Sequence, residues 1–215
     1  CHLPPATCHL QGIAIEVAAA AHPFDASGGG DAARASQFRT LIHGDPKAAN
    51  LFIRPAGSDP IAGSDPAGSG EAVEVGLIDF QWTGFGLAAT DVAHHLCAAV
   101  STDALEGDGE RRLLDHYHAE LCAALAVEGV AGSATEAAER VIPRQLLQSQ
   151  YETAVLDMCR LVFSYQWSRF QESSSADSLN RNSYNKDMRN AVWLVARGDE
   201  LLRARGVTDM ESSRG

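Results

Sequence analysis

Lysine is scarce in this chain of 215 residues. Only Lys47 and Lys186 are lysines among 17 basic residues, against 28 acidic residues, and the formal net charge is −11. Proteins that bind nucleic acid backbones release counterions through clustered basic side chains. The sequence offers no such cluster, so we expect no nucleic acid partner.

Long hydrophobic runs are also missing. No segment of eighteen apolar residues, the length that spans a bilayer, occurs in the sequence. Residues 12–21 are apolar but too short to span, and they lack the basic flank of a signal peptide. We therefore expect no membrane association and a cytoplasmic location.

Cysteines are few and do not form a zinc-binding pattern. There are five, an odd number without the ligand spacing of a zinc site. Cys97, Cys122 and Cys159 lie in apolar helical stretches and are predicted to be buried, reduced thiols. Hydrophobic residues make up 45% and charged residues 21%, which is typical of a folded domain.

Strand patterns occur in the first half of the chain. "FRTLIHGD" alternates apolar residues, "NLFI" at 50–53 is a short apolar run, and "VEVGLIDF" at 73–80 alternates again. Between the last two, residues 54–70 repeat "AGSDP" and are rich in Pro, Gly, Ser and Asp, which is typical of a surface loop. The two segments are therefore predicted to form a hairpin with an insertion at its tip.

The rest of the chain has helical periodicity. A short helix is predicted at 10–21, followed by a loop at 22–36. Thr90 is a predicted N-cap, and "SATE" at 133–136 fits a capping box. The chain is thus predicted to be α+β with helices dominant, and the later helices are expected at 90–100, 109–129, 133–142, 143–170 and 186–205.

Three oxygen-bearing side chains are predicted to converge at the base of the hairpin. Asp45 and Asn50 are five residues apart before the first strand, and Asp79 ends the second strand. A hairpin returns the end of its second strand to the start of its first. Mg²⁺ prefers oxygen ligands, and a free carboxylate can accept a hydroxyl proton. The pattern therefore favours phosphoryl transfer.

The segments "HGDPKAANLFI" and "GLIDFQWTGFGLAATDVAHHL" resemble the aminoglycoside phosphotransferase and choline kinase-like superfamily, most closely its ecdysteroid-kinase-like and choline/ethanolamine-kinase-like branches. These families are relatives of protein kinases. The resemblance implies a protein-kinase-like carboxyl-terminal lobe, mostly helical, with a small β-hairpin that carries the catalytic and metal motifs. It also implies ATP- and Mg²⁺-dependent phosphorylation of a small-molecule alcohol. The helices from 110 to 205 agree in kind with that lobe.

The resemblance assigns roles to four residues of these motifs. Asp45 becomes the catalytic base, and Asn50 and Asp79 hold Mg²⁺ and, through it, the nucleotide phosphates. His43 supports the catalytic loop through hydrogen bonds and does no chemistry.

Two further charged residues have alternative interpretations. Lys47 stands where a family lysine touches the transferred phosphate, but a solvated surface lysine is an equal alternative. Asp91 stands where a downstream aspartate steadies the catalytic loop, or it is a first-turn acid favoured by the helix dipole.

The remaining histidines and Trp82 are assigned mostly to structure. His94 and His95 are adjacent on a helix and diverge, as do His116 and His118, so neither pair is expected to share a metal ion. All four are predicted to be packing or surface residues. Trp82 is a core residue or a wall of the substrate site.

The predicted organisation is a partial lead-in helix and loop at 1–40, a kinase-like lobe at 41–205 with a low-complexity insertion at 54–72, and a tail at 206–215.

The family's amino-terminal lobe carries a lysine that pairs with the nucleotide phosphates, and no lysine precedes Lys47. The start at Cys1 favours a fragment of an active kinase. We therefore expect a chain that is inactive as it stands, or alternatively a non-catalytic pseudokinase-like binding module. A hydrolase with a carboxylate-bound metal is a third interpretation. The substrate and the oligomeric state are left open.

Overall fold

The computed structural model describes residues 39–55, 73–165 and 188–206. The predicted helix at 10–21, the loop at 22–36 and nearly all of the insertion at 54–72 lie outside the described residues. Along the chain the elements are β1 (Arg39–Ile42), η2 (Ala48–Asn50), β2 (Leu51–Pro55), β3 (Val73–Leu77), η3 (Phe80–Trp82), β4 (Gly84–Leu87), α3 (Ala88–Ala99), α4 (Thr102–Leu105), α5 (Gly109–Val127), α6 (Ala134–Glu136), η4 (Ala137–Val141), α7 (Arg144–Tyr165) and α8 (Met188–Ala204).

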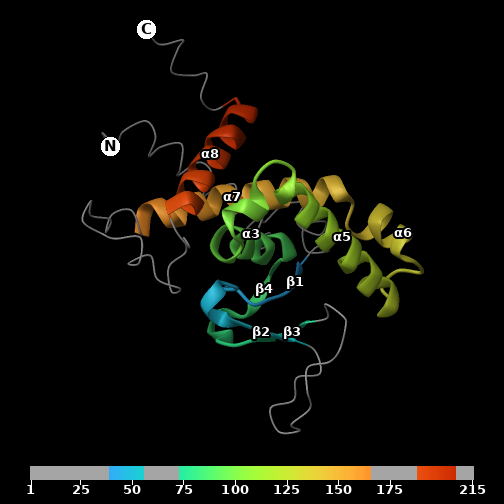
Figure 1. The fold of residues 1–215 in the computed structure, drawn as a ribbon. Helices are drawn as coiled ribbons and strands as arrows, with labels where there is room; N and C mark the ends of the chain where they lie inside the picture. Colours follow the sequence, from blue (N-terminus) through green and yellow to red (C-terminus); the bar gives the residue numbers. More distant parts are fainter. Residues whose placement is uncertain (1–38, 56–72, 166–187, 207–215) are drawn as a thin grey trace, which may run out of the picture.

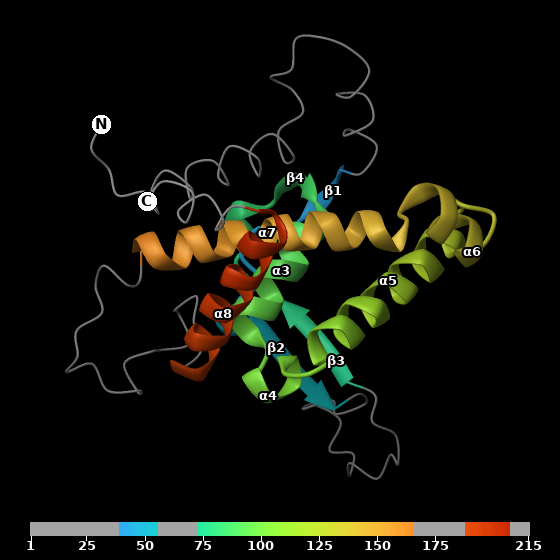
Figure 2. The same cartoon turned by 90° about the horizontal axis from the view of Figure 1, so that it is seen from above.

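Helix α3 lies at the centre of the described helices, and the strands lie on one side of it (Figure 1). Helix α7 runs across α3, α8 packs against both of them, and α5 packs against α7 (Figure 2). The core between them is apolar and includes Ala93, Cys97, Leu147, Val155 and Leu194. Helices thus dominate over a small amount of antiparallel sheet, as the sequence predicts. Among the described residues, no helix is long and apolar enough to cross a membrane.

The predicted hairpin is present as β2 and β3, which pair antiparallel with Leu51 opposite Leu77. A second two-stranded sheet is formed by β1 and β4. The sequence predicts β1 but not β4, because β4 has the sequence Gly-Phe-Gly-Leu and lacks an alternating apolar pattern. The pairing with β1 explains why position 86 is a glycine. A Cβ at position 86 would collide with the side chain of Ile42, so Gly86 lets the two strands approach.

Helix α3 begins two residues before the predicted N-cap, so the assignment of Thr90 was wrong. Leu87 occupies the N-cap position, and no side chain caps the helix there. Strand β4 leads directly into α3, which sets the start of the helix at Ala88. Asp91, in the first turn, points its carboxylate at the loop before β2 instead of at its own helix end.

The predicted capping box is present at the start of α6. The hydroxyl of Ser133 accepts the backbone N–H of Glu136 at 3.1 Å, and the Glu136 carboxylate accepts the backbone N–H of Gly132 at 2.9 Å. The helix that follows differs from the expectation for 133–142, because it becomes a π-helix at η4 after one α-turn. The preceding helix α5 ends near Gly129, whose φ of +73° suits a helix terminus.

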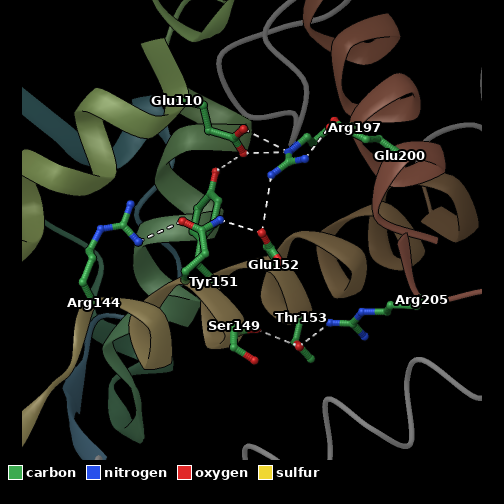
Figure 3. Close-up of polar contacts among 10 residues, drawn as sticks. Glu110, Arg144, Ser149, Tyr151, Glu152, Thr153, Arg197, Glu200 and Arg205 are labelled. Carbon is green, nitrogen blue, oxygen red and sulfur yellow. Dashed lines mark hydrogen bonds and ion pairs between the residues drawn. The ribbon is translucent and has the colours of Figure 1, made fainter. Parts of the chain in front are cut away.

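A polar network ties α5, α7 and α8 together (Figure 3). The Glu110 carboxylate accepts hydrogen bonds from the Tyr151 hydroxyl at 2.8 Å and from Nε of Arg197 at 3.1 Å. Arg197 also donates to Glu200 at 2.8 Å. The side chains of Arg197 and Glu110 are only 15% and 16% exposed, so neither charge could be left unpaired without a substantial desolvation cost.

The three described cysteines are buried, free thiols, which confirms the prediction for Cys97, Cys122 and Cys159. Burial raises the pKa of Cys97 well above its ordinary value and raises that of Cys159 to about 12. These two thiols therefore stay protonated near neutral pH and act as small apolar core residues.

We expect Arg197→Met to lower the free energy of unfolding by about 2 kcal/mol, because Glu110 would keep only the Tyr151 hydrogen bond in a nearly buried position. Urea denaturation followed by circular dichroism measures this. Arg203→Met on the same helix is the control. Its pair with Asp199 is 68% exposed on the arginine side, so we expect a loss of less than about 0.5 kcal/mol. Equal losses in the two variants would contradict the role given to the network.

Candidate active site

The loop between β1 and η2 is held by Asp91 on α3. The backbone N–H of His43 donates to one carboxylate oxygen of Asp91 at 2.6 Å, and the backbone N–H of Gly44 donates to the other at 2.9 Å. Gly44 has a φ of +84°, and a Cβ there would collide with the backbone of Trp82. The glycine of "HGD" is thus required both by its conformation and by the close approach of η3.

His43 joins the loop to the hairpin. Its Nδ1 accepts the backbone N–H of Asp45 at 3.3 Å, so its Nε2, 2.9 Å from the carbonyl oxygen of Ile78, must be the donor. The ring also lies against Phe80, with the centroids 4.9 Å apart. These contacts use both ring nitrogens of His43 for structure and leave neither for chemistry.

Asp45 is the most deeply buried carboxylate of the described residues, at 3% exposure. Its Oδ2 accepts Nζ of Lys47 at 2.6 Å and Nδ2 of Asn50 at 3.2 Å. Its Oδ1 receives no hydrogen bond from the described part of the chain and lies 3.4 Å from Nε2 of His94. One oxygen is therefore anchored, while the other is left for a further donor.

Asp79 is placed beside Asn50 by the hairpin register. The backbone N–H of Ile78 donates to the carbonyl oxygen of Asn50 at 3.1 Å, and Asp79 is the next residue. Asp79 adopts a left-handed conformation with a φ of +65°, the only non-glycine residue with a positive φ in the described ranges. Such conformations carry a cost and tend to occur at functional sites.

The donor set at this point fits a hard divalent cation. The amide nitrogen of Asn50 is used in hydrogen bonds to Asp45, and within the described residues no hydrogen bond reaches the Asn50 amide oxygen or the exposed Asp79 carboxylate. No cluster of three or more His, Cys, Asp or Glu side chains suited to a metal occurs in the described ranges. Mg²⁺ needs only one or two protein oxygens, with phosphates and waters supplying the rest, so Asn50 and Asp79 would suffice.

A cavity of about 240 Å³ opens beside Asp45, between α3, α7 and η3. Its walls are mostly apolar, and Asp157, which is paired with Arg160 at 2.7 Å, adds a second carboxylate. The cavity is lined by Gly44, Asp45, Trp82, Thr90, His94, Ala154, Asp157, Met158 and Leu161. Trp82 therefore forms a wall of this cavity and is not a core residue.

Two histidines that the sequence assigned to packing or the surface contact the loop. His94 faces Asp45, and Nδ1 of His95 lies 3.1 Å from the carbonyl oxygen of Pro46. Their spacing from Asp91 could have revealed this, because residues three and four positions along a helix share a face with the first. By contrast, His116 is exposed, and His118 bonds the carbonyl oxygen of Ile142 at 2.7 Å, in keeping with the prediction.

Comparison with known families bears on this site directly. Residues 26–129 match the model of the ecdysteroid kinase-like family. Over this segment the chain is similar to that family. The finding confirms the resemblance that the motifs indicate. The matched segment contains the loop, the hairpin and α3, which meet at Asp45. No curated protein and no solved structure matches the chain.

We expect Asp91→Asn to loosen the loop, because an amide has one acceptor oxygen where the carboxylate has two. Exchange of the His43 or Gly44 amide proton should become faster by about tenfold or more, as expected for the loss of a hydrogen bond to a charged acceptor. Hydrogen exchange followed by NMR measures this. Asp103→Asn, on the exposed side of α4, is the control and should leave both amides unchanged. Unchanged exchange in Asp91→Asn would contradict its supporting role.

Proposed function

We propose that this protein is a phosphotransferase domain that moves the γ-phosphoryl group of ATP to a hydroxyl of a small molecule, with Mg²⁺. The observation that carries the proposal is how the two carboxylate oxygens of Asp45 are hydrogen-bonded. One of its oxygens is anchored by Lys47 and Asn50, the other receives no hydrogen bond from the described residues, and the residue lines a cavity. A general base for a bound alcohol needs a fixed carboxylate with one oxygen that no other donor occupies. The match of residues 26–129 to a kinase-like family supports the reaction class.

The proposed roles divide the reaction among residues of the loop and the hairpin. Asp45 orients the alcohol and accepts its proton. Asn50 and Asp79 would hold Mg²⁺, which when bound neutralises charge on the phosphates. Lys47, which pairs with Asp45 at 2.6 Å, lies where its ammonium group could also meet the phosphate being transferred. His43 and Asp91 act only by holding the loop.

The outer surface of the hairpin suits a nucleotide base. In an antiparallel pair, alternate residues share a face, so the cross-strand pairs Leu51/Leu77 and Ile53/Val75 lie on the same face. All but Leu51 are exposed, and Leu51 is half-buried. This apolar face belongs to the same strands that position Asn50 and Asp79. A purine lying on it would therefore place its phosphates at the proposed metal ligands.

The kinase-like lobe assigned to 41–205 and its flanking segments belong to this proposal. We expect slow or no turnover by residues 1–215 alone, because no lysine precedes Lys47 to pair with the nucleotide phosphates. The second candidate is a non-catalytic binding module. Calorimetry with Mg-ATP separates the two: tight binding favours the phosphotransferase, and no heat at millimolar nucleotide favours the module.

In an enzyme that also carries the lobe with the phosphate-pairing lysine, we expect Asp45→Asn to reduce phosphoryl transfer by about 10²- to 10⁴-fold, which is the usual contribution of a general base. Transfer is measured with γ-labelled ATP, Mg²⁺ and a panel of small-molecule alcohols. The affinity for Mg-ATP should change little, since Asp45 is not a proposed ligand, and Asp103→Asn should match the wild type in both assays. Full transfer activity in Asp45→Asn would remove this residue from the role of base.

We expect Asp79→Asn to weaken binding of Mg-ATP by about tenfold or more, because even outer-shell partners of a metal are worth that much. Calorimetry with Mg²⁺, and again with EDTA, measures the metal-dependent part. Glu74→Gln on β3 is the control, because its carboxylate pairs with Arg54 across the hairpin. Equal affinities in wild type and Asp79→Asn would exclude Asp79 as a ligand.

A further inference from the structure

A second cavity, of about 350 Å³, opens between β1, the first turn of α3, α5 and the end of η4. Its lining shares no residue with that of the cavity at Asp45. From α3 it takes Ala88 and Asp91, whereas the cavity at Asp45 takes Thr90 and His94 from the same helix. The larger cavity is therefore a separate place, in which the proposed transfer reaction puts no ligand.

One wall of this second cavity is a stripe of side chains on α5. Tyr117, Leu121 and Leu125 stand four residues apart, so they share one face of the helix. All three pack against the hydrophobic core, which fixes the wall. Val141 and Ile142, at the end of η4, form the adjoining wall. A cavity that is mostly apolar and already formed is typical of a small-molecule site.

The adjoining wall is shaped by the π-helix. The backbone N–H of Ile142 donates to the carbonyl oxygen of Ala137, five residues earlier, at 2.9 Å. The carbonyl oxygen of Ile142 lies 2.7 Å from Nε2 of His118 on α5, and this bond holds the end of η4 against α5. A π-helix is rare and frequently lies at a functional site, and this one ends at the cavity.

Tyr117 brings a hydrogen-bond donor to this apolar surface. Its hydroxyl makes no hydrogen bond within the described residues, and the oxygen keeps accessible surface. Burial and, to a smaller extent, the carboxylate of Asp91 raise the pKa of Tyr117 above its ordinary value, so the hydroxyl keeps its proton near pH 7. Arg39 and Asp91 both line the cavity and carry opposite charges. The lining as a whole therefore has no net charge.

We propose that this cavity binds a neutral, compact hydrocarbon molecule with one oxygen acceptor, and that the acceptor takes a hydrogen bond from the Tyr117 hydroxyl. An apolar cavity of roughly 150 Å³ holds a benzene molecule, so this one has room for about two six-membered rings. A carboxylate would bring a charge that the lining does not compensate, and an ammonium group has no lone pair to accept from Tyr117. The site does not depend on the proposed function.

Camphor, a bicyclic ketone, is the probe, and bornylamine, which carries an ammonium group on the same skeleton, is the comparison. Titration of the full chain is followed through backbone ¹H–¹⁵N NMR signals. We expect camphor to bind with a Kd of about 0.1 to 1 mM and to shift the signals of Leu121 and Val130, while those of α8 stay unchanged. The amides of His43 and Gly44 should also shift, because their acceptor Asp91 lines the cavity. Bornylamine should bind about fivefold more weakly or worse.

Two variants test the place and the hydrogen bond. Val130 lines the cavity but is 60% exposed, so Val130→Trp narrows the cavity without disturbing the core. We expect it to weaken camphor binding about tenfold or more through lost apolar contact. Val127→Trp, at an exposed residue outside the lining, is the matched control and should bind as the wild type does. Tyr117→Phe keeps the ring but loses the donor, and should weaken camphor binding about three- to tenfold without affecting bornylamine.

Several results would overturn the inference. One is the absence of shifts up to about 5 mM camphor, several times the highest expected Kd, and another is a set of shifts centred on Trp82 and the cavity at Asp45. Equal affinities in Val130→Trp and Val127→Trp, wild-type affinity in Tyr117→Phe, or bornylamine that binds as tightly as camphor would do the same. None of these measurements uses ATP, so they leave the phosphotransfer assay to decide the proposed function separately.

Discussion

The carboxylate of Asp91 fixes the position of the loop that carries Asp45. It accepts the backbone N–H groups of two successive residues, His43 and Gly44, at 2.6 and 2.9 Å. Hydrogen bonds to an ionised acceptor are about twice as strong as neutral ones, and two of them define both position and orientation. Because Asp91 belongs to α3, the central helix of the described fold, the loop is tied to the hydrophobic core of the described residues.

The rest of the site follows from that attachment. The turn of α3 after Asp91 presents His94 and His95 to the same loop, one at Asp45 and one at the carbonyl of Pro46. On the opposite side, His43 bonds the carbonyl of Ile78, which brings the end of β3 and hence Asp79 to the loop. The candidate site is thus the meeting point of a loop, a hairpin and a helix, each held to the others by specific polar contacts.

Much of this arrangement can be predicted from the sequence, because its signals are local. The alternation in β3 and the helical periodicity after residue 88 predict the hairpin and the main helices, and the motifs around Asp45 and Asp79 carry the resemblance to the matched family. Strand β4 was missed because its short glycine-containing sequence becomes a strand only by pairing with β1, some forty residues earlier. Thr90 was misjudged as an N-cap for a similar reason: strand pairing before the helix sets where α3 starts.

The contact of His94 is indicated in the sequence only by its spacing from Asp91 on the same helix. A histidine on an apolar helix is usually a packing residue, and only the position of the loop, set by Asp91, turns this one toward a carboxylate. The π-helix at η4 has no sequence signal that we recognise. Contacts between segments distant in the chain are therefore the part of the candidate site that needed the structure.

The central claim is that oxygen atoms from the loop and from the hairpin gather around one divalent ion. Paramagnetic broadening by Mn²⁺ with ADP, observed on the backbone amide signals of the full chain, tests it most directly. The account predicts that the amides of Asp45, Asn50 and Asp79 broaden together at substoichiometric Mn²⁺, while those of α5 and α8 stay sharp. Broadening centred elsewhere, or of only one of the three amides, would contradict it.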